Sequence, residues 1–170
     1  FYVELDEAAP QTMHTDAKRL QQIIKNLLSN AFKFTHHGHV TLTVQSVTSG
    51  WNPENEELNR APQVIVFEVS DTGIGISPDK QQIIFEAFQQ ADGSTSRKYG
   101  GTGLGLAISR ELSRLLGGEI RLTSEAGRGA ISALFLFHQP TRNSKSWPRP
   151  KRSRRFSMLF PTCFTKQRAS

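Results

Sequence analysis

The sequence predicts a single α+β domain, and three features predict it. Short runs of alternating apolar and polar residues are typical of strands, and residues 40–47 give the clearest example. Two longer segments repeat apolar residues with the period of an α-helix. A chain of 170 residues is long enough for one core and too short for two domains of ordinary size. We therefore expect one core built from both kinds of element.

The first two predicted elements are a strand and a helix. Residues 1–5 alternate as a short strand does. A helix is predicted over 16–34, because either Thr15 or Asp16 can cap it and one apolar stripe runs along it. That stripe consists of Leu20, Ile24, Leu27, Ala31 and Phe34.

The same helix has a second, polar stripe beside the apolar one. At about 100° per residue, Asn26, Asn30 and Lys33 line up along the helix. Residues 40–47 then form the half-buried strand. Residues 49–62 are polar and rich in turn-forming residues, so they are predicted to be an exposed loop.

A buried strand over 64–69 comes next. A short helix is predicted after Pro78, with four apolar residues on it: Ile83, Ile84, Phe85 and Phe88. Residues 89–102 are polar, contain glycine and have no period, which predicts a mobile lid.

The last predicted elements are a helix and two strands. The helix runs from Gly103 to the Gly117 stop, and its expected core side holds Leu104, Ile108, Leu112 and Leu115. Strands follow near 119–123 and 130–137, and the domain is expected to end close to Pro140.

Charge separates the chain into two parts. The net charge is +6, but residues 141–170 hold nine of the 21 Lys and Arg residues and no acidic residue. Residues 1–140 therefore hold 12 basic and 15 acidic residues, a net charge of −3. We expect a domain over 1–140 and a basic, disordered tail over 141–170.

Other bulk features narrow the class of protein. Cys163 is the only cysteine, which excludes an intrachain disulfide and favours a reducing compartment. No apolar run approaches the roughly 18 to 20 residues of a membrane span, and the first residues do not form a signal peptide. The chain is expected to be a segment of a longer protein.

Two glycine clusters flank the predicted lid. The first is Gly73-x-Gly75, after a strand, and the second is the run GGTGLG at residues 100–105, which opens a helix. Glycine lets the backbone approach a ligand closely, and a helix N-terminus offers amides to phosphate. No lysine follows a glycine, which excludes a P-loop, and the Gly-x-Gly-x-x-Gly spacing of a dinucleotide fold does not occur.

These clusters belong to a set of four ordered motifs. They are NLLSNAFKFT at residues 26–35, DTGIGI at 71–76, FEAF at 85–88 and GTGLGL at 101–106. The set closely resembles the N, G1, F and G2 boxes of the histidine kinase catalytic domain. That domain has the Bergerat (GHKL-type) ATP-binding fold, which type II topoisomerases, a heat-shock chaperone and mismatch-repair ATPases share. Residues 16–35 most resemble the hybrid kinases.

The resemblance implies a fold and a ligand. The fold is a two-layer α/β sandwich in which a mixed, mostly antiparallel sheet is covered on one face by helices and an ATP lid is flexible. The ligand is ATP with Mg²⁺. Asn30 is expected to bind Mg²⁺ through its amide oxygen, Asn26 to support it or to contact phosphate through water, and Lys33 to add positive charge near the phosphates.

The nucleoside is expected to lie against the first glycine cluster. Asp71 is suited to accept the adenine amino proton, and an unpaired buried acceptor there disfavours guanine. Gly73 and Gly75 let the chain pass beside the base, with Ile76 following, and Phe34 is expected to pack near the nucleoside.

The lid and the second cluster are expected to hold the phosphates. Arg97 and Lys98 are candidate phosphate contacts, and Phe85 and Phe88 are expected to anchor the base of the lid. The amide-rich turn at the helix start consists of Gly101, Thr102, Gly103, Leu104 and Gly105.

Structural interpretations of the same residues stay open. The two asparagines of the polar stripe can be exposed helix residues, and Asp71 can cap a turn. Phe34, Leu104 and the phenylalanines of the FEAF motif can be ordinary core, and the lid cations can be solvated. The histidines at 36, 37 and 39 favour a solvated turn over a metal site, and none has the neighbours of a phosphoacceptor histidine.

Three classes of function are weighed. In hydrolysing members of the fold a glutamate stands where this chain has Asn26, and an amide is no general base. The resemblance therefore implies phosphotransfer to a histidine on a dimerisation domain outside this chain, rather than an ATP-driven clamp. A nucleic-acid-binding module acting through the basic tail is the third class, and it is not expected.

The resemblance also implies partners and a location. Those partners are the histidine-containing dimerisation domain in cis and a downstream response regulator or receiver domain. The whole protein is expected to be a membrane-associated homodimer, with this domain on the cytoplasmic side of a bacterial inner membrane.

Three features depart from the family pattern. The end of the fold reads Gly127-x-Gly129-Ala130, which leaves the adenine-side contact of the last strand open. Gln89 and Gln90 follow the FEAF motif where some members have an arginine. The tail resembles nothing in the family, and we hypothesise that it is a frameshifted gene end.

Overall fold

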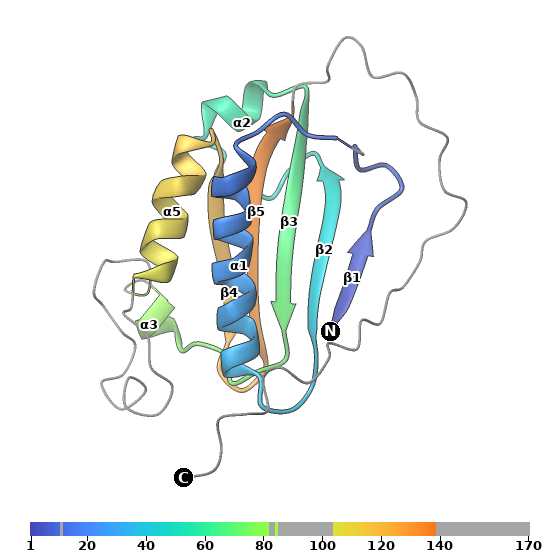
Figure 1. Ribbon diagram of the computed structural model, residues 1–170. Coiled ribbons are helices and arrows are strands. Elements are labelled where there is room, and N and C mark those ends of the chain that lie inside the picture. Colours follow the sequence, from blue (N-terminus) through green and yellow to red (C-terminus); the bar gives the residue numbers. More distant parts are fainter. Residues whose placement is uncertain (11, 82–83, 85–103, 139–170) are drawn as a thin grey trace.

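The protein folds around one five-stranded sheet, shown in Figure 1. The computed structural model describes residues 1–10, 12–81, 84 and 104–138. In spatial order the strands are β1 (Tyr2–Leu5), β2 (Val40–Val47), β3 (Gln63–Asp71), β5 (Gly129–His138) and β4 (Glu119–Glu125). β1 pairs with β2 in parallel, and every other pair is antiparallel. The predicted mixed, mostly antiparallel sheet is confirmed.

Two helices cover one face of this sheet. They are α1 (Ala17–Phe34) and α5 (Gly105–Leu115), and both lie on the same side in Figure 1. Their apolar side chains meet alternate residues of the central strands, as the period of two in a strand requires. The fully buried members of this core are Ile23, Leu27, Ala31, Val40, Val69, Leu134 and Leu136. The predicted two-layer α+β sandwich is therefore correct.

α1 begins where the sequence predicts, with one change in its buried stripe. The Asp16 carboxylate accepts hydrogen bonds from the Lys18 and Arg19 amides at 3.0 and 3.1 Å, so Asp16 and not Thr15 is the cap. Ile23 is fully buried, whereas the predicted Ile24 is only partly buried. The side of α1 that faces the core is therefore rotated slightly from the predicted side.

The predicted core side of α5 is wrong at two positions. Ile108 and Leu115 are 39% and 66% exposed, whereas Ser109 and Ser113 are completely buried. α5 turns small residues toward the neighbouring elements. Its partly buried Leu106 and Leu112, and Leu116 directly after it, pack against the main core. A leucine stripe alone does not reveal this rotation, because α5 is apolar on more than one side.

The predicted loop 49–62 contains a short helix, α2 (Glu56–Arg60). Asn55 caps it by accepting a hydrogen bond from the Leu58 amide at 3.1 Å. Leu58 is 1% exposed and packs with Val64, Val66 and Phe135 on the sheet face that α1 and α5 leave uncovered. The loop prediction was wrong because one leucine anchors this polar segment.

The segment after β3 begins with α3 (Pro78–Gln81). The Ser77 hydroxyl, as the main cause, lowers the pKa of the exposed Asp79 carboxyl. Ile84 is buried, while Ile83, Phe85, Phe88, the predicted lid and the predicted tail lie outside the described residues. In the described part of the chain, no helix is both long and apolar enough to cross a bilayer.

Candidate functional site

The C-terminal ends of α1 and β3 meet at one end of the sheet (Figure 1). The Thr35 hydroxyl, directly after α1, donates to Asp71 Oδ1 at 3.4 Å. The Ile74 amide donates to the carbonyl of Phe34 at 3.2 Å. Two motifs that are 36 residues apart in the chain therefore touch, as a single site requires.

Asp71 is the last residue of β3, and its carboxylate is partly buried. Its Oδ1 accepts the Gly73 amide at 2.9 Å as well as the Thr35 hydroxyl. Both contacts use the same oxygen, so Oδ2 keeps its capacity to accept a hydrogen bond from a ligand. The local hydrogen bonds fix the position of the Asp71 carboxylate and leave its second oxygen able to bind a ligand.

The turn after Asp71 has room only for glycine at two positions. A Cβ at Gly73 would collide with the carbonyl oxygen of Phe34 and lie 2.8 Å from Asp71 Oδ1. Gly75 has a φ of +65°, and a Cβ there would collide with the carbonyl of Glu125. These glycines let the turn pack tightly between the end of α1 and the end of β4.

Side chains that sequence reasoning did not single out support this turn. The Ser124 hydroxyl accepts the Ile76 amide at 2.8 Å and donates to the Gly129 carbonyl at 2.6 Å. The Gln81 amide donates to the carbonyls of Ile76 and Ser124, both at 2.8 Å. Ser124 is the second-last residue of β4 and Gln81 ends a short helix, so neither has a local signal in the sequence.

One residue of the predicted polar stripe, Asn26, contacts α5. The Asn26 amide nitrogen donates to the Gly105 carbonyl at 3.2 Å and to the Ser109 hydroxyl at 3.1 Å. Asn30 is partly buried one turn later. The Lys33 Nζ lies 5.0 Å from the centre of the Phe34 ring, within cation–π distance.

The start of α5 lies beside this stripe. Leu104 occupies the N-cap position, and its apolar side chain makes no capping hydrogen bond to the first amides of α5. A Cβ on Gly105 would lie 3.8 Å from Asn26 Cγ, an ordinary contact. Six other predicted site residues lie outside the described residues: Phe88, Arg97, Lys98, Gly101, Thr102 and Gly103.

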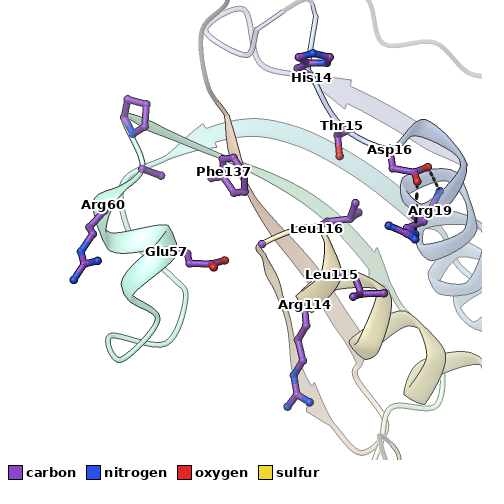
Figure 2. Close-up of a pocket in the computed structure, with 13 residues that line it drawn as sticks. His14, Thr15, Asp16, Arg19, Glu57, Arg60, Arg114, Leu115, Leu116 and Phe137 are labelled. Atoms are coloured by element: carbon purple, nitrogen blue, oxygen red, sulfur yellow. Dashed lines mark hydrogen bonds and ion pairs between the residues drawn. The ribbon is translucent and has the colours of Figure 1, made fainter.

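A separate cavity opens at the opposite end of the helices. Its volume is about 680 Å³, and Figure 2 shows it between the start of α1, the end of α5 and α2. Asp16, Glu57, Leu116 and Phe137 are among the residues that line it. Asp16 and Asn30 are 14 residues apart on α1, roughly 21 Å along the axis, so this cavity is distinct from the predicted site.

The sequence matches a known family over most of its length. Residues 15–143 match the model of the histidine kinase-, DNA gyrase B-, and HSP90-like ATPases. The chain is 48% identical over 122 residues to the hybrid signal transduction histidine kinase A of Dictyostelium discoideum, covering 71% of this chain and 6% of that protein. It is 42% identical over 129 residues to the histidine-protein kinase BarA of Escherichia coli strain K12, covering 76% of this chain and 13% of BarA.

Solved structures and other relatives agree with this assignment. The full-length ShkA structure in complex with AMPPNP has a TM-score of 0.60 and 34% identity, covering 81% of this chain and 26% of ShkA. The peroxide stress-activated histidine kinase mak2 of Schizosaccharomyces pombe is 37% identical over 81% of this chain and 6% of its own length. The chain thus spans only a small part of these relatives. It belongs to the histidine kinase-, DNA gyrase B-, and HSP90-like ATPase family and is an ATP-binding domain of the kind found in histidine kinases.

Proposed function

We propose that this domain binds MgATP and donates the γ-phosphate to a histidine on a dimerisation domain of a two-component sensor kinase. The observation that supports it most is the junction of α1, β3 and the glycine turn. There, one oxygen of Asp71 is held by the chain and the other keeps its capacity for a ligand. We place the domain at residues 1–140, with 141–170 as a separate basic tail.

Recognition of the base is assigned to Asp71 and the turn after it. The Asp71 carboxylate accepts the adenine amino proton through Oδ2. Guanine would place its carbonyl oxygen there, so two acceptors would face each other and no hydrogen bond could form. Gly73, Gly75 and Ile76 form the backbone surface beside the base, and Phe34 packs near the nucleoside.

The phosphates and Mg²⁺ are assigned to the polar stripe and to the start of α5. Asn30 offers an amide oxygen, which suits a hard cation that also keeps waters and phosphate oxygens. Within the described part of the chain, no three His, Cys, Asp or Glu side chains gather as an ion site. Mg²⁺ would neutralise charge on the transferring phosphoryl group.

Other phosphate contacts come from further along the chain and from Lys33. Lys33 adds positive charge beside Asn30, and Leu104 and Gly105 present the first turn of α5. The remaining phosphate ligands of this proposal are Arg97, Lys98, Gly101, Thr102 and Gly103. Phe88 is proposed to anchor the base of the lid.

Phosphotransfer is favoured over hydrolysis by the chemistry of Asn26. Its amide nitrogen donates to two acceptors on α5, and an amide cannot take a proton from water at neutral pH. We therefore assign the nucleophile to the imidazole of the dimerisation domain. This chain's residues bind and orient the nucleotide for in-line attack.

The whole protein is proposed to resemble its hybrid relatives. Its partners are the dimerisation domain in cis and a response regulator or receiver domain, and nucleic acid is not among them. We propose a membrane-associated homodimer with this domain in the cytoplasm, at a bacterial inner membrane. The relatives from Schizosaccharomyces pombe and Dictyostelium discoideum are eukaryotic, so a eukaryotic source is the alternative to a bacterial one.

Calorimetric titration with a non-hydrolysable ATP analogue tests the site. Removing the Asp71 carboxylate deletes a charge-assisted hydrogen bond, so Asp71→Ala is expected to weaken binding about tenfold or more, with or without Mg²⁺. Asn30→Ala should lose the increase in affinity that Mg²⁺ gives to the wild type. Asn59→Ala, on the exposed side of α2, is the asparagine control and should bind as the wild type does.

Two further titrations separate the parts of the proposal. A GTP analogue should bind much more weakly than the ATP analogue, and the difference should shrink in Asp71→Ala. Unchanged binding in both site variants would rule out the site assignment.

Phosphotransfer itself is tested by a separate experiment. A separately produced dimerisation domain of a relative is added together with ATP, and acid-labile phosphate on that domain is measured.

A further inference from the structure

Asn26 is tied to α5 by its side-chain amide. The Gly105 carbonyl, 3.2 Å from Nδ2, can only accept a hydrogen bond, so the nitrogen and not the oxygen of Asn26 must face it. The same nitrogen is 3.1 Å from the Ser109 hydroxyl oxygen, one helical turn further along α5. Both hydrogens of the amide thus have an acceptor on α5, and the orientation of its plane is fixed.

Ser109 is the buried member of this arrangement. Its side chain is completely buried at the contact between α1 and α5, where a hydroxyl without a partner would be unfavourable. Ser113, one turn later, is equally buried, but its hydroxyl donates to the Arg110 carbonyl of its own helix at 2.7 Å. The two serines therefore have the same burial and different partners, one across the interface and one within α5.

The orientation of Asn26 decides what it presents to a ligand. With both amide hydrogens directed at α5, only Oδ1 is left to face Mg²⁺, a bound water or the next residue of the stripe, Asn30. If the amide turned over, it would present hydrogens to the cation and would place two oxygens against each other at Gly105.

We propose that Ser109 is a positioning residue of the nucleotide site. By accepting an Asn26 amide hydrogen, it keeps the Asn26 oxygen available on the metal side and holds the first turn of α5 at a fixed place on α1. The proposal rests on the proposed function, since it concerns the Mg²⁺-dependent part of nucleotide binding. The proposal adds to the nucleotide site a buried residue, Ser109, that does not itself touch the nucleotide.

The test compares Ser109→Ala with Ser113→Ala in the full chain. Each variant is titrated with a non-hydrolysable ATP analogue, once in excess Mg²⁺ and once in EDTA, after a thermal melt confirms that it is folded. Ser109→Ala is expected to lose about fivefold in affinity in Mg²⁺, the equivalent of one hydrogen bond, and to stay within about twofold in EDTA. Ser113→Ala should match the wild type in both conditions, and Ser109→Thr, which keeps the acceptor oxygen, should restore the Mg²⁺ effect.

Other results would overturn the proposal. Equal losses in the two alanine variants, or a loss in Ser109→Ala that is the same with EDTA, would mean that the serine only fills space. A wild type that binds no analogue would instead contradict the proposed function. The contact can then still be judged by NMR of the wild type without nucleotide. The Asn26 side-chain amide protons, assigned with Asn26→Ala, should show cross-peaks to the Ser109 β protons, and their absence would disprove the contact.

Discussion

Gly73 lies where the end of α1 meets the end of β3, and its missing side chain is what lets them meet. A methyl group there would collide with the backbone of Phe34, which cannot move without disturbing the helix end. We expect Gly73→Ala to lower the free energy of unfolding by about 1–3 kcal/mol, as overpacking does, and to weaken nucleotide binding as Asp71 shifts. Urea denaturation and calorimetry measure the two effects.

Gly105→Ala is the control for the stability of this variant. Its Cβ would make only ordinary contacts with Asn26, and a helix favours alanine over glycine. The free energy of unfolding should stay the same or rise by up to about 1 kcal/mol. A Gly73→Ala protein as stable as Gly105→Ala would show that the junction is looser than described.

At this scale the sequence singles out residues of ligand type more readily than the residues that support them. Asp71 and the two glycines of the turn stand in one motif, so their proximity follows from the sequence itself. Ser109 and Ser124 act through Asn26 and Ile76, which are far away in the chain, and a serine in a helix or a strand carries no mark of such a partner. Their roles depend on tertiary contacts, which one sequence without a structure does not contain.

Among the elements, α2 shows how a single apolar residue changes the structure of a polar segment. Leu58 fills the sheet face opposite α1, and Asn55 both caps α2 and donates to Glu119 Oε2 at 2.9 Å. Leu58→Ala should lower the free energy of unfolding by about 2–5 kcal/mol, because it leaves a cavity over the sheet. Urea denaturation followed by circular dichroism measures this change.

Glu56→Ala is the control on the same helix. Its ion pair with Arg60 joins two side chains that are 73% and 78% exposed, so its loss should change stability by less than about 0.5 kcal/mol. Similar losses in the two α2 variants would mean that α2 is not anchored through Leu58.

The strands and α1 were predicted closely, and the exceptions have physical causes. Strand periodicity is clear in β2, because apolar and polar residues alternate along it. In α5 the apolar pattern is misleading, since the buried Ser109 and Ser113 and the exposed Ile108 and Leu115 reverse the usual assignment of core and surface. α2 was missed because five residues are too few for a period to be seen.

For the whole molecule, the uneven distribution of charge gives a direct test. The first 140 residues are net negative and the last 30 hold nine of the basic residues, so any attraction to nucleic acid should come from the tail. Truncation after residue 140 should leave affinity for the ATP analogue unchanged and abolish salt-sensitive retention on a DNA column. Loss of analogue binding on truncation would contradict the proposed domain boundary.

The position of β3 in the middle of the sheet also affects the thermodynamics of nucleotide binding. β3 is paired on both sides, by β2 and β5, and its residues Val64, Val66 and Val69 are almost completely buried. Backbone amides in such a strand exchange with solvent only when the whole domain opens. The carboxylate that we propose binds adenine stands at the end of this strand, so it loses little conformational entropy when a nucleotide arrives. Selectivity for the base is therefore expected to persist even where neighbouring segments fluctuate.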